Sequence, residues 1–194
     1  MKSIIRGLPI RVTIQNVVAS ASLGHNLDLK AVFKAFFPNV EYRPETFPGL
    51  AFKLKKPKSC TLLFETGKMV CTGTKSEREA ERAVMKVIRE LRKAGVAAKH
   101  EKPEFAVQNI VASVNLGGVR IDLEGIALKS RGNVLYEPEQ FPGLIYRMDD
   151  PKVVFLIFVT GKLVCVGAKN EKDVYRAVEK LIKILEEKDA IIKS

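Results

Sequence analysis

Hydrophobic and polar residues alternate over residues 10–21, where the apolar positions are rich in Val and Ile. This period of two predicts a β-strand. Asp28 then stands where it can cap a short amphipathic helix that ends before Pro38. Short strands are predicted next around 40–42, 51–54, 59–65 and 68–74, separated by Pro-Gly, Pro-Lys and Thr-Gly-Lys turns.

A long helix is predicted after these strands. Ser76 and Glu79 have the spacing of a capping box, so we expect a helix from Ser76 to about Ala94. Its apolar residues recur every three or four positions and form one stripe: Ala80, Ala83, Val84, Val87, Ile88 and Leu91. The second half of the chain has the same stripe at Val174, Ala177, Val178, Leu181, Ile182 and Leu185.

The whole pattern occurs twice along the chain. The sequence QNVVAS at 15–20 returns as QNIVAS at 108–113, and FPGL at 47–50 returns at 141–144. Offsets of 93 and 94 residues are too long for a solenoid repeat and indicate a tandem duplication. We therefore predict a first repeat over 8–94, a polar linker over 95–103 and a second repeat over 104–188.

One face of the predicted sheet stays uncovered, because one long helix per repeat can cover only the other. Side chains alternate between the faces of a strand, and either set here contains large apolar residues. An exposed apolar face marks a binding surface, unless a dimer or a third layer covers it. Asn16 and Asn109 lie in the middle of strands, where Asn is disfavoured, so each serves a ligand, a buried polar network or a strand edge.

Charge points to a polyanionic partner. The chain has 194 residues, 46% of them hydrophobic and 28% charged, which is typical of a globular protein, and a net charge of +11. That excess favours nucleic acid before an anionic membrane. Residues 1–100 hold 19 basic and 8 acidic residues, against 14 and 14 in 101–194. This split is either drift on a solvated surface or a sign that the two halves meet different partners.

Catalysis, cofactors, metals and membrane insertion find no support in the residues. Three cysteines without a CxxC pair and two histidines do not suggest a disulfide framework or a metal site. Cys71 and Cys165 are expected to face the helices as small core residues. The apolar run 153–159 is too short to span a bilayer and the N-terminus lacks a signal-peptide pattern, so we expect an intracellular protein.

Several of these motifs together resemble a known family. QNVVAS, QNIVAS, NLGGVRIDL, YEPEQFPGLIYRM, GKMVCTG and GKLVCVG are similar to the core of the TATA-binding protein family, in order and spacing, over residues 8–188. The resemblance implies an α+β fold: a pseudo-two-fold saddle with a ten-stranded curved antiparallel sheet and four helices on its convex face. The short N-terminus resembles the archaeal members.

The resemblance also implies a DNA site in the minor groove, and this family is itself a standard example of that binding mode. The positions that match its intercalating side chains are Phe47, Phe64, Phe141 and Phe158. Phe36, Phe37 and Phe155 are instead read as core or helix residues. The implied groove-binding residues are Asn16, Val18, Leu62, Val70, Thr72, Asn109, Val111, Leu156, Val164 and Val166. The family usually has threonine where Val166 stands. The implied contacts to the DNA backbone are Lys53, Lys68, Arg147 and Lys162.

The implied function is that of a general transcription initiation factor that binds and kinks TATA promoter elements and recruits transcription factor B and RNA polymerase. It would be associated with DNA, in the nucleoid of an archaeon or the nucleus of a eukaryote. Glu137, Glu139 and Gln140 resemble the loop that meets factor B. Arg43 stands at the position of Glu137 in the first repeat, which favours a partner for the second repeat alone over a mere loop difference.

Two other functions remain hypotheses at this point. One is a non-catalytic DNA- or RNA-binding module of a nuclease or glycosylase with the same fold. The other is a structural module that self-associates through the open sheet face. The sequence also leaves open a homodimer of the DNA-free protein.

Overall fold

The computed structural model describes residues 2–5, 7–98 and 102–193. The predicted linker 95–103 includes residues 99–101, which lie outside the described residues. The first half of the chain forms β1 (Lys2–Ile5), β2 (Leu8–Ser22), α1 (Leu29–Phe36), β3 (Val40–Tyr42), β4 (Leu50–Lys55), β5 (Lys58–Leu63), β6 (Lys68–Thr74) and α2 (Glu77–Lys93). The second half forms β7 (Glu104–Asn115), β8 (Val119–Ile121), α3 (Leu123–Lys129), β9 (Val134–Leu135), β10 (Leu144–Met148), β11 (Val153–Ile157), β12 (Lys162–Ala168), α4 (Glu171–Glu187) and β13 (Ile191–Lys193).

The helices begin where their capping residues stand. The Asp28 carboxylate accepts hydrogen bonds from the backbone N–H groups of Lys30 and Ala31 at the start of α1. At the start of α2, Ser76 Oγ accepts from the N–H of Glu79 at 3.0 Å. The Glu79 carboxylate accepts from the N–H of Lys75, one residue before the position that a capping box would use. The predicted helices are therefore confirmed. The reading of Phe37 as a core or helix residue is wrong, because α1 ends at Phe36 and the Phe37 side chain is 67% exposed.

The chain folds as two compact units. Asn16–Gln108 form the first, here called the N-unit, and Met1–Gln15 with Asn109–Ser194 form the second, the C-unit. Strands β2 and β7 each pass from one unit into the other, between Gln and Asn of the repeated QN motif. The compact units thus exchange the first half of each repeat's opening strand, which the repeat pattern alone did not indicate.

Each unit contains an antiparallel sheet. The strand order is β3-β4-β5-β6-β2-β7 in the N-unit and β2-β7-β12-β11-β10-β9 in the C-unit, where β1 also pairs with β2. These orders contain the ten predicted strands. In addition, β8 and β13 form a separate two-stranded sheet in the C-unit, for which the first repeat has no described counterpart.

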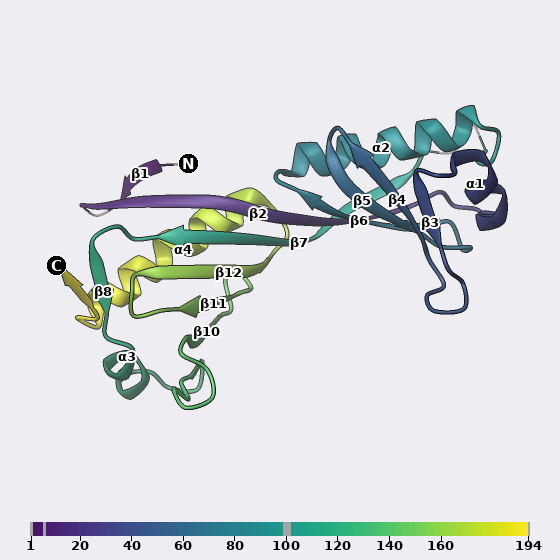
Figure 1. Ribbon diagram of the computed structural model, residues 1–194. Coiled ribbons are helices and arrows are strands. Elements are labelled where there is room, and N and C mark those ends of the chain that lie inside the picture. The colour runs from purple at the N-terminus through teal and green to yellow at the C-terminus, as the bar shows by residue number, and fades with distance from the viewer. Residues whose placement is uncertain (1, 6, 99–101, 194) are drawn as a thin grey trace. The chain divides into compact units, whose positions relative to one another are not determined.

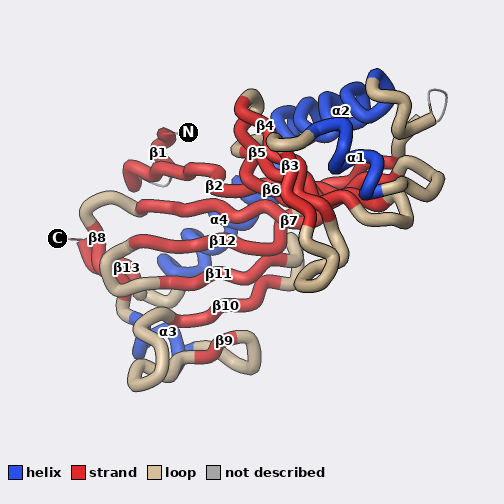
Figure 2. The backbone as a smooth tube through the Cα atoms, turned by 45° about the vertical axis from the view of Figure 1, so that its right-hand side comes forward, coloured by secondary structure: helices blue, strands red, loops and turns tan. Residues whose placement is uncertain are grey.

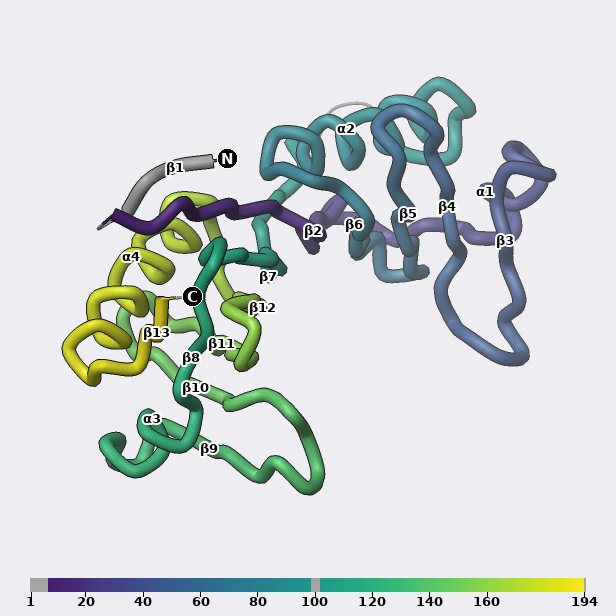
Figure 3. Tube along the Cα trace, turned by 60° about the vertical axis from the view of Figure 1, so that its left-hand side comes forward, coloured from purple at the N-terminus to yellow at the C-terminus, as the bar shows by residue number. Residues whose placement is uncertain are grey.

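The long helices cover one face of each sheet, α2 in the N-unit and α4 in the C-unit (Figures 1 and 2). All twelve residues of their predicted apolar stripes are buried. The loops between β3 and β4 and between β9 and β10 project beyond the sheet of their own unit (Figure 3). Within the described residues, no helix is long and apolar enough to cross a membrane.

The alternating strand positions confirm which side is core. Met69 and Cys71 of β6 are buried, whereas Val70 and Thr72 are half-buried on the opposite face. The pattern recurs in β12, and burial raises the pKa of the Cys165 thiol to about 12. Burial also raises the pKa of Cys71. Both thiols are therefore core groups, as expected from the sequence.

Strand β2 changes the parity of its buried positions where it crosses between the units. The buried side chains of β2 are Leu8, Ile10 and Val12 in the C-unit, and Val17, Ala19 and Ala21 in the N-unit. The pairing of β2 with β6 shifts register between Val17 and Ala19, and that of β12 with β7 shifts between Val166 and Ala168. Each shift is a β-bulge that places an extra residue in β6 or β12, whose buried positions change parity from Cys71 to Thr74 and from Cys165 to Ala168.

Phe155 provides a test of the face assignment. Its side chain is 0% exposed in the C-unit core, so Phe155→Ala should lower the free energy of unfolding by about 3–5 kcal/mol. Phe158→Ala, at a half-buried position on the open face, should lower the free energy of unfolding by clearly less than Phe155→Ala does. Urea denaturation of both variants measures the difference, and a larger loss for Phe158→Ala would mean that the faces are inverted.

Candidate nucleic-acid interface

The face opposite the helices carries a floor of branched apolar side chains in each unit. All ten residues predicted to bind the groove are half-buried there. Cross-strand pairing places Leu62 beside Val70 in the N-unit and Leu156 beside Val164 in the C-unit. Val111 is likewise paired with Val166. The structure thus brings each predicted set together within its own unit.

An aromatic pair lies at one end of each floor. The rings of Phe47 and Phe64 pack edge to face with centroids 6.0 Å apart, and those of Phe141 and Phe158 with centroids 5.8 Å apart. Phe47 and Phe141 are 43% and 37% exposed, although they are large apolar residues. Each pair is therefore a preformed, partly exposed wedge.

The loops that carry these wedges have the same turn, although Arg43 in the first corresponds to Glu137 in the second. The N–H of Phe47 donates to the Arg43 carbonyl, and the N–H of Phe141 donates to the Glu137 carbonyl, both at 3.0 Å. Because the backbone carbonyl makes this bond, the side chain at that position is free to differ. Glu137, Glu139 and Gln140 are all exposed in their loop, as a contact site for a partner would require.

Gly49 and Gly143 are site residues that sequence reasoning had treated only as turn formers. A Cβ atom on Gly49 would lie 2.6 Å from Phe47 Cε1, and one on Gly143 would lie 2.7 Å from Phe141 Cε1. Any larger residue would push the rings apart. The signal in the sequence was the recurrence of the whole FPGL motif, because a turn alone does not require its Phe and Gly together.

The two mid-strand asparagines support the bulges with their side chains. The N–H of Gly73 donates to Asn16 Oδ1 at 2.8 Å, and the N–H of Gly167 donates to Asn109 Oδ1 at 2.7 Å. Both glycines have positive φ, 94° and 101°, which favours glycine there. Because a backbone N–H can only donate, the amide oxygen of each Asn must face its glycine.

This bond determines what each asparagine can offer to a ligand. Its acceptor is occupied within the protein, and Nδ2 has no partner within the described residues. The open face therefore presents an oriented NH₂ group, a pure donor, in the middle of each strand. The side-chain oxygen of Asn16 and of Asn109 therefore has a structural role. The side-chain nitrogen of each remains available to a ligand.

A second pair of polar contacts joins β2 to β7. Gln15 Nε2 donates to Ser113 Oγ at 2.8 Å in the C-unit, and Gln108 Nε2 donates to Ser20 Oγ at 2.7 Å in the N-unit. Sequence reasoning did not single out these residues. The signal was present, since Gln and Ser hold fixed positions around Asn in both copies of the motif.

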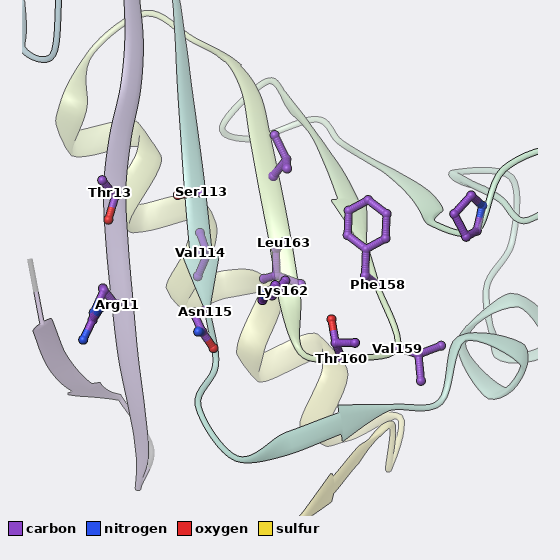
Figure 4. A pocket seen from close by; sticks show the side chains of 12 residues that line it. Arg11, Thr13, Ser113, Val114, Asn115, Phe158, Val159, Thr160, Lys162 and Leu163 are labelled. Carbon is purple, nitrogen blue, oxygen red and sulfur yellow. The ribbon is translucent and has the colours of Figure 1, made fainter.

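The basic residues predicted to meet DNA phosphates are all exposed. Lys53 Nζ lies 3.6 Å from Glu41 Oε2, and the Glu41 carboxylate also pairs with Arg43. Within the described part of the chain, Lys68, Arg147 and Lys162 have no salt-bridge partner. In the C-unit, Lys162 and Phe158 line a groove of about 730 Å³ on the open face (Figure 4). Three cations are thus available for an anionic ligand.

The described residues provide no metal centre. No group of three or more His, Cys, Asp or Glu side chains among them is placed to hold a metal ion. His100 lies outside the described residues. The three cysteines are free, and only Cys60 is half-exposed.

The fold and this face define a two-repeat α+β protein with an open, donor-bearing apolar surface. A family described as "Transcription factor TFIID (or TATA-binding protein, TBP)" matches residues 11–94 and 104–188. The chain therefore belongs to the TATA-binding protein family, whose members are non-catalytic DNA-binding transcription factors, and it is not an enzyme.

Known relatives match over nearly their whole length. The TATA-box-binding protein of Pyrodictium occultum is 50% identical over 178 residues, covering 92% of this chain and 87% of that protein. That of Methanocaldococcus jannaschii is 49% identical over 176 residues, covering 91% and 94%. The solved structure "Methanococcus jannaschii TBP" aligns with a TM-score of 0.79 and 48% identity over 91% of this chain and 99% of that chain. The predicted fold class is confirmed.

The asparagine bond to the bulge is testable by stability alone. Asn109→Ala removes the acceptor of the Gly167 N–H and should cost about 0.5–1.5 kcal/mol of unfolding free energy. Asn109→Asp keeps an acceptor at the same position and should retain most of that stability. Urea unfolding of the two variants is the measurement, and equal losses would show that the bond does not hold the bulge.

Proposed function

We propose that this protein is a general transcription initiation factor that binds the minor groove of A·T-rich promoter elements and kinks the DNA with its four exposed-face phenylalanines. The observation that carries the proposal is an uncovered apolar sheet face with an aromatic wedge at its end, present in both units. Membership of the family and the names of the archaeal relatives support it.

The chemistry of the floor matches A·T base pairs. Their minor-groove edges present only acceptors, adenine N3 and thymine O2, and the NH₂ groups of Asn16 and Asn109 can donate to them. A guanine N2 amino group would press a donor against side chains such as Val164 and Leu156, which cannot accept it. The floor therefore discriminates A·T from G·C without reading each base pair individually.

The aromatic wedges provide the means to bend DNA. Unstacking a base step costs a few kcal/mol, and a Phe ring inserted there replaces part of the lost stacking. Bent DNA can then contact more of the protein surface, which offsets the remaining cost. Pyrimidine–purine steps such as TA kink most easily, so they favour the ends of the site.

The loop of Glu137, Glu139 and Gln140 is proposed to recruit transcription factor B, and with it RNA polymerase. These side chains are exposed and project from the C-unit sheet, while the first repeat has Arg43 in place of Glu137. A partner that recognises the acidic loop would therefore bind the second repeat alone. The protein is accordingly proposed to act on chromosomal DNA.

Binding to A·T-rich and G·C-rich duplexes at one stated salt concentration tests the function. The unmodified protein should bend and prefer the A·T-rich duplex, and Phe158→Ala should weaken both binding and the bend. Val164→Glu should abolish binding while the protein stays folded, because its carboxylate would be desolvated against acceptor-only base edges. Gel shift, a bend-sensitive fluorescence pair and a thermal melt give the three readouts.

Equal weak binding of both duplexes would favour the alternative, a non-catalytic module of a nuclease or glycosylase. Loss of folded protein in the Val164→Glu variant would show that this face is core. An unbent complex with undiminished affinity would contradict the wedge role while leaving the groove preference intact.

The acidic loop has its own test. Glu139→Arg should leave binary DNA binding and the bend unchanged, because the loop lies outside the sheet face. It should weaken recruitment of factor B by roughly 1–3 kcal/mol if a charged hydrogen bond is lost. Glu45→Arg, the matching change in the first repeat, is the control and should leave recruitment unchanged. Supershift assays on one labelled TATA duplex measure this, and equal losses from both changes would refute the polarity argument.

A further inference from the structure

The open face contains a groove in each unit, and these two grooves are repeat-related. The C-unit groove measures about 730 Å³ and the N-unit groove about 510 Å³. The groove positions that the two share are Ser113, Val114, Asn115, Lys162, Leu163 and Val164 in the C-unit and Ser20, Ala21, Ser22, Lys68, Met69 and Val70 in the N-unit. The two halves of the chain therefore share one wall of the groove at equivalent positions.

A second wall differs in charge between the two grooves. It is formed by β2 in the C-unit and by β7 in the N-unit, and residues 93 apart occupy equivalent places. The C-unit groove is also lined by Pro142, Phe158, Val159 and Thr160, whose repeat equivalents do not line the N-unit groove. Arg11 and Thr13 lie on β2 beside Ser113 and Asn115 of β7 (Figure 4). At the equivalent places of the N-unit stand Glu104 and Ala106. An arginine in one groove thus corresponds to a glutamate in the other.

These charges are available to a ligand. Arg11 and Glu104 are exposed, and neither has a salt-bridge or side-chain hydrogen-bond partner within the described residues. Each groove also has one exposed lysine, Lys162 or Lys68. The C-unit groove therefore has two cations at its margin, whereas the acidic group of the N-unit groove offsets its single cation.

We propose that Arg11 is an additional contact to the DNA backbone, and that Glu104 withholds the equivalent contact from the N-unit, so that the two units hold the two ends of the DNA site with unequal strength. This rests on the proposed function. A guanidinium group binds phosphate oxygens through two parallel N–H bonds, whereas a carboxylate is repelled by them. The backbone of an A·T-rich duplex is thus the ligand that fits the C-unit groove margin.

The expected effect can be stated as a salt dependence. Each phosphate contact contributes a slope of about 0.9 to the fall of log K with log salt, so one lost contact weakens binding about eightfold at 0.1 M salt. Arg11→Ala should therefore lower the slope by about one unit. Glu104→Ala should tighten binding without changing the slope, because it removes a repulsion and adds no contact.

The experiment measures DNA affinity against salt concentration for the full chain on one TATA duplex. Arg89→Ala, at an exposed position of α2 on the helix-covered side, is the control that loses the same charge away from the open face. It should leave the slope unchanged. The double variant Arg11→Glu with Glu104→Arg keeps the net charge and moves the contact to the other unit, so it should restore the slope of the unmodified protein.

Two outcomes would overturn the inference. An unchanged slope for Arg11→Ala would show that Arg11 does not contact the backbone, and equal reductions for Arg11→Ala and Arg89→Ala would show that only net charge matters. Failure of the unmodified protein to bind the TATA duplex at any of these salt concentrations would instead refute the proposed function. Circular dichroism melts of each variant confirm that folded proteins are compared.

Discussion

One amphipathic helix per repeat can cover only one face of an antiparallel sheet, and the rest of the structure depends on this constraint. The six-residue stripes of α2 and α4 are fully buried against one face of each unit. The opposite face keeps its Val, Leu and Phe side chains half-buried, at a cost in exposed apolar area. The protein tolerates that cost where a ligand can later cover the surface.

The bulges at Gly73 and Gly167 connect the architecture to the site. They shift the buried positions of β6 and β12 by one residue, from Cys71 to Thr74 and from Cys165 to Ala168, and the asparagine oxygens hold them in place. The same bonds turn the asparagine NH₂ groups toward the open face. A stabilising contact thus also prepares a donor for a ligand, and the two roles use different atoms of one side chain.

The duplication produces two nearly equivalent sites, and under the proposed function the differences between them would give the bound DNA a direction. A symmetric floor would bind a nearly symmetric groove equally well in either direction. Asymmetry enters at a few positions where charge or polarity differs between the repeats: Arg43 against Glu137, Arg11 against Glu104, and Thr72 against Val166. The turns at Arg43 and Glu137 keep the same hydrogen bond to the following Phe, so the fold tolerates that substitution.

Much of this protein follows from its sequence, because periodicity and capping act locally. The sequence predicted that helices begin after Asp28 and Ser76. It also predicted the order of strands along the chain and the two faces of β6 and β12. The resemblance in the repeated motifs also indicated the four phenylalanines and the floor before any coordinates. Other features depend on residues far apart in the chain. The exchange of strand halves between units, the room that Gly49 leaves for two rings and the bond from Gly73 to Asn16 form only when strands pair in register. Only the tertiary structure decided them, because a pattern of residue types contains no distances.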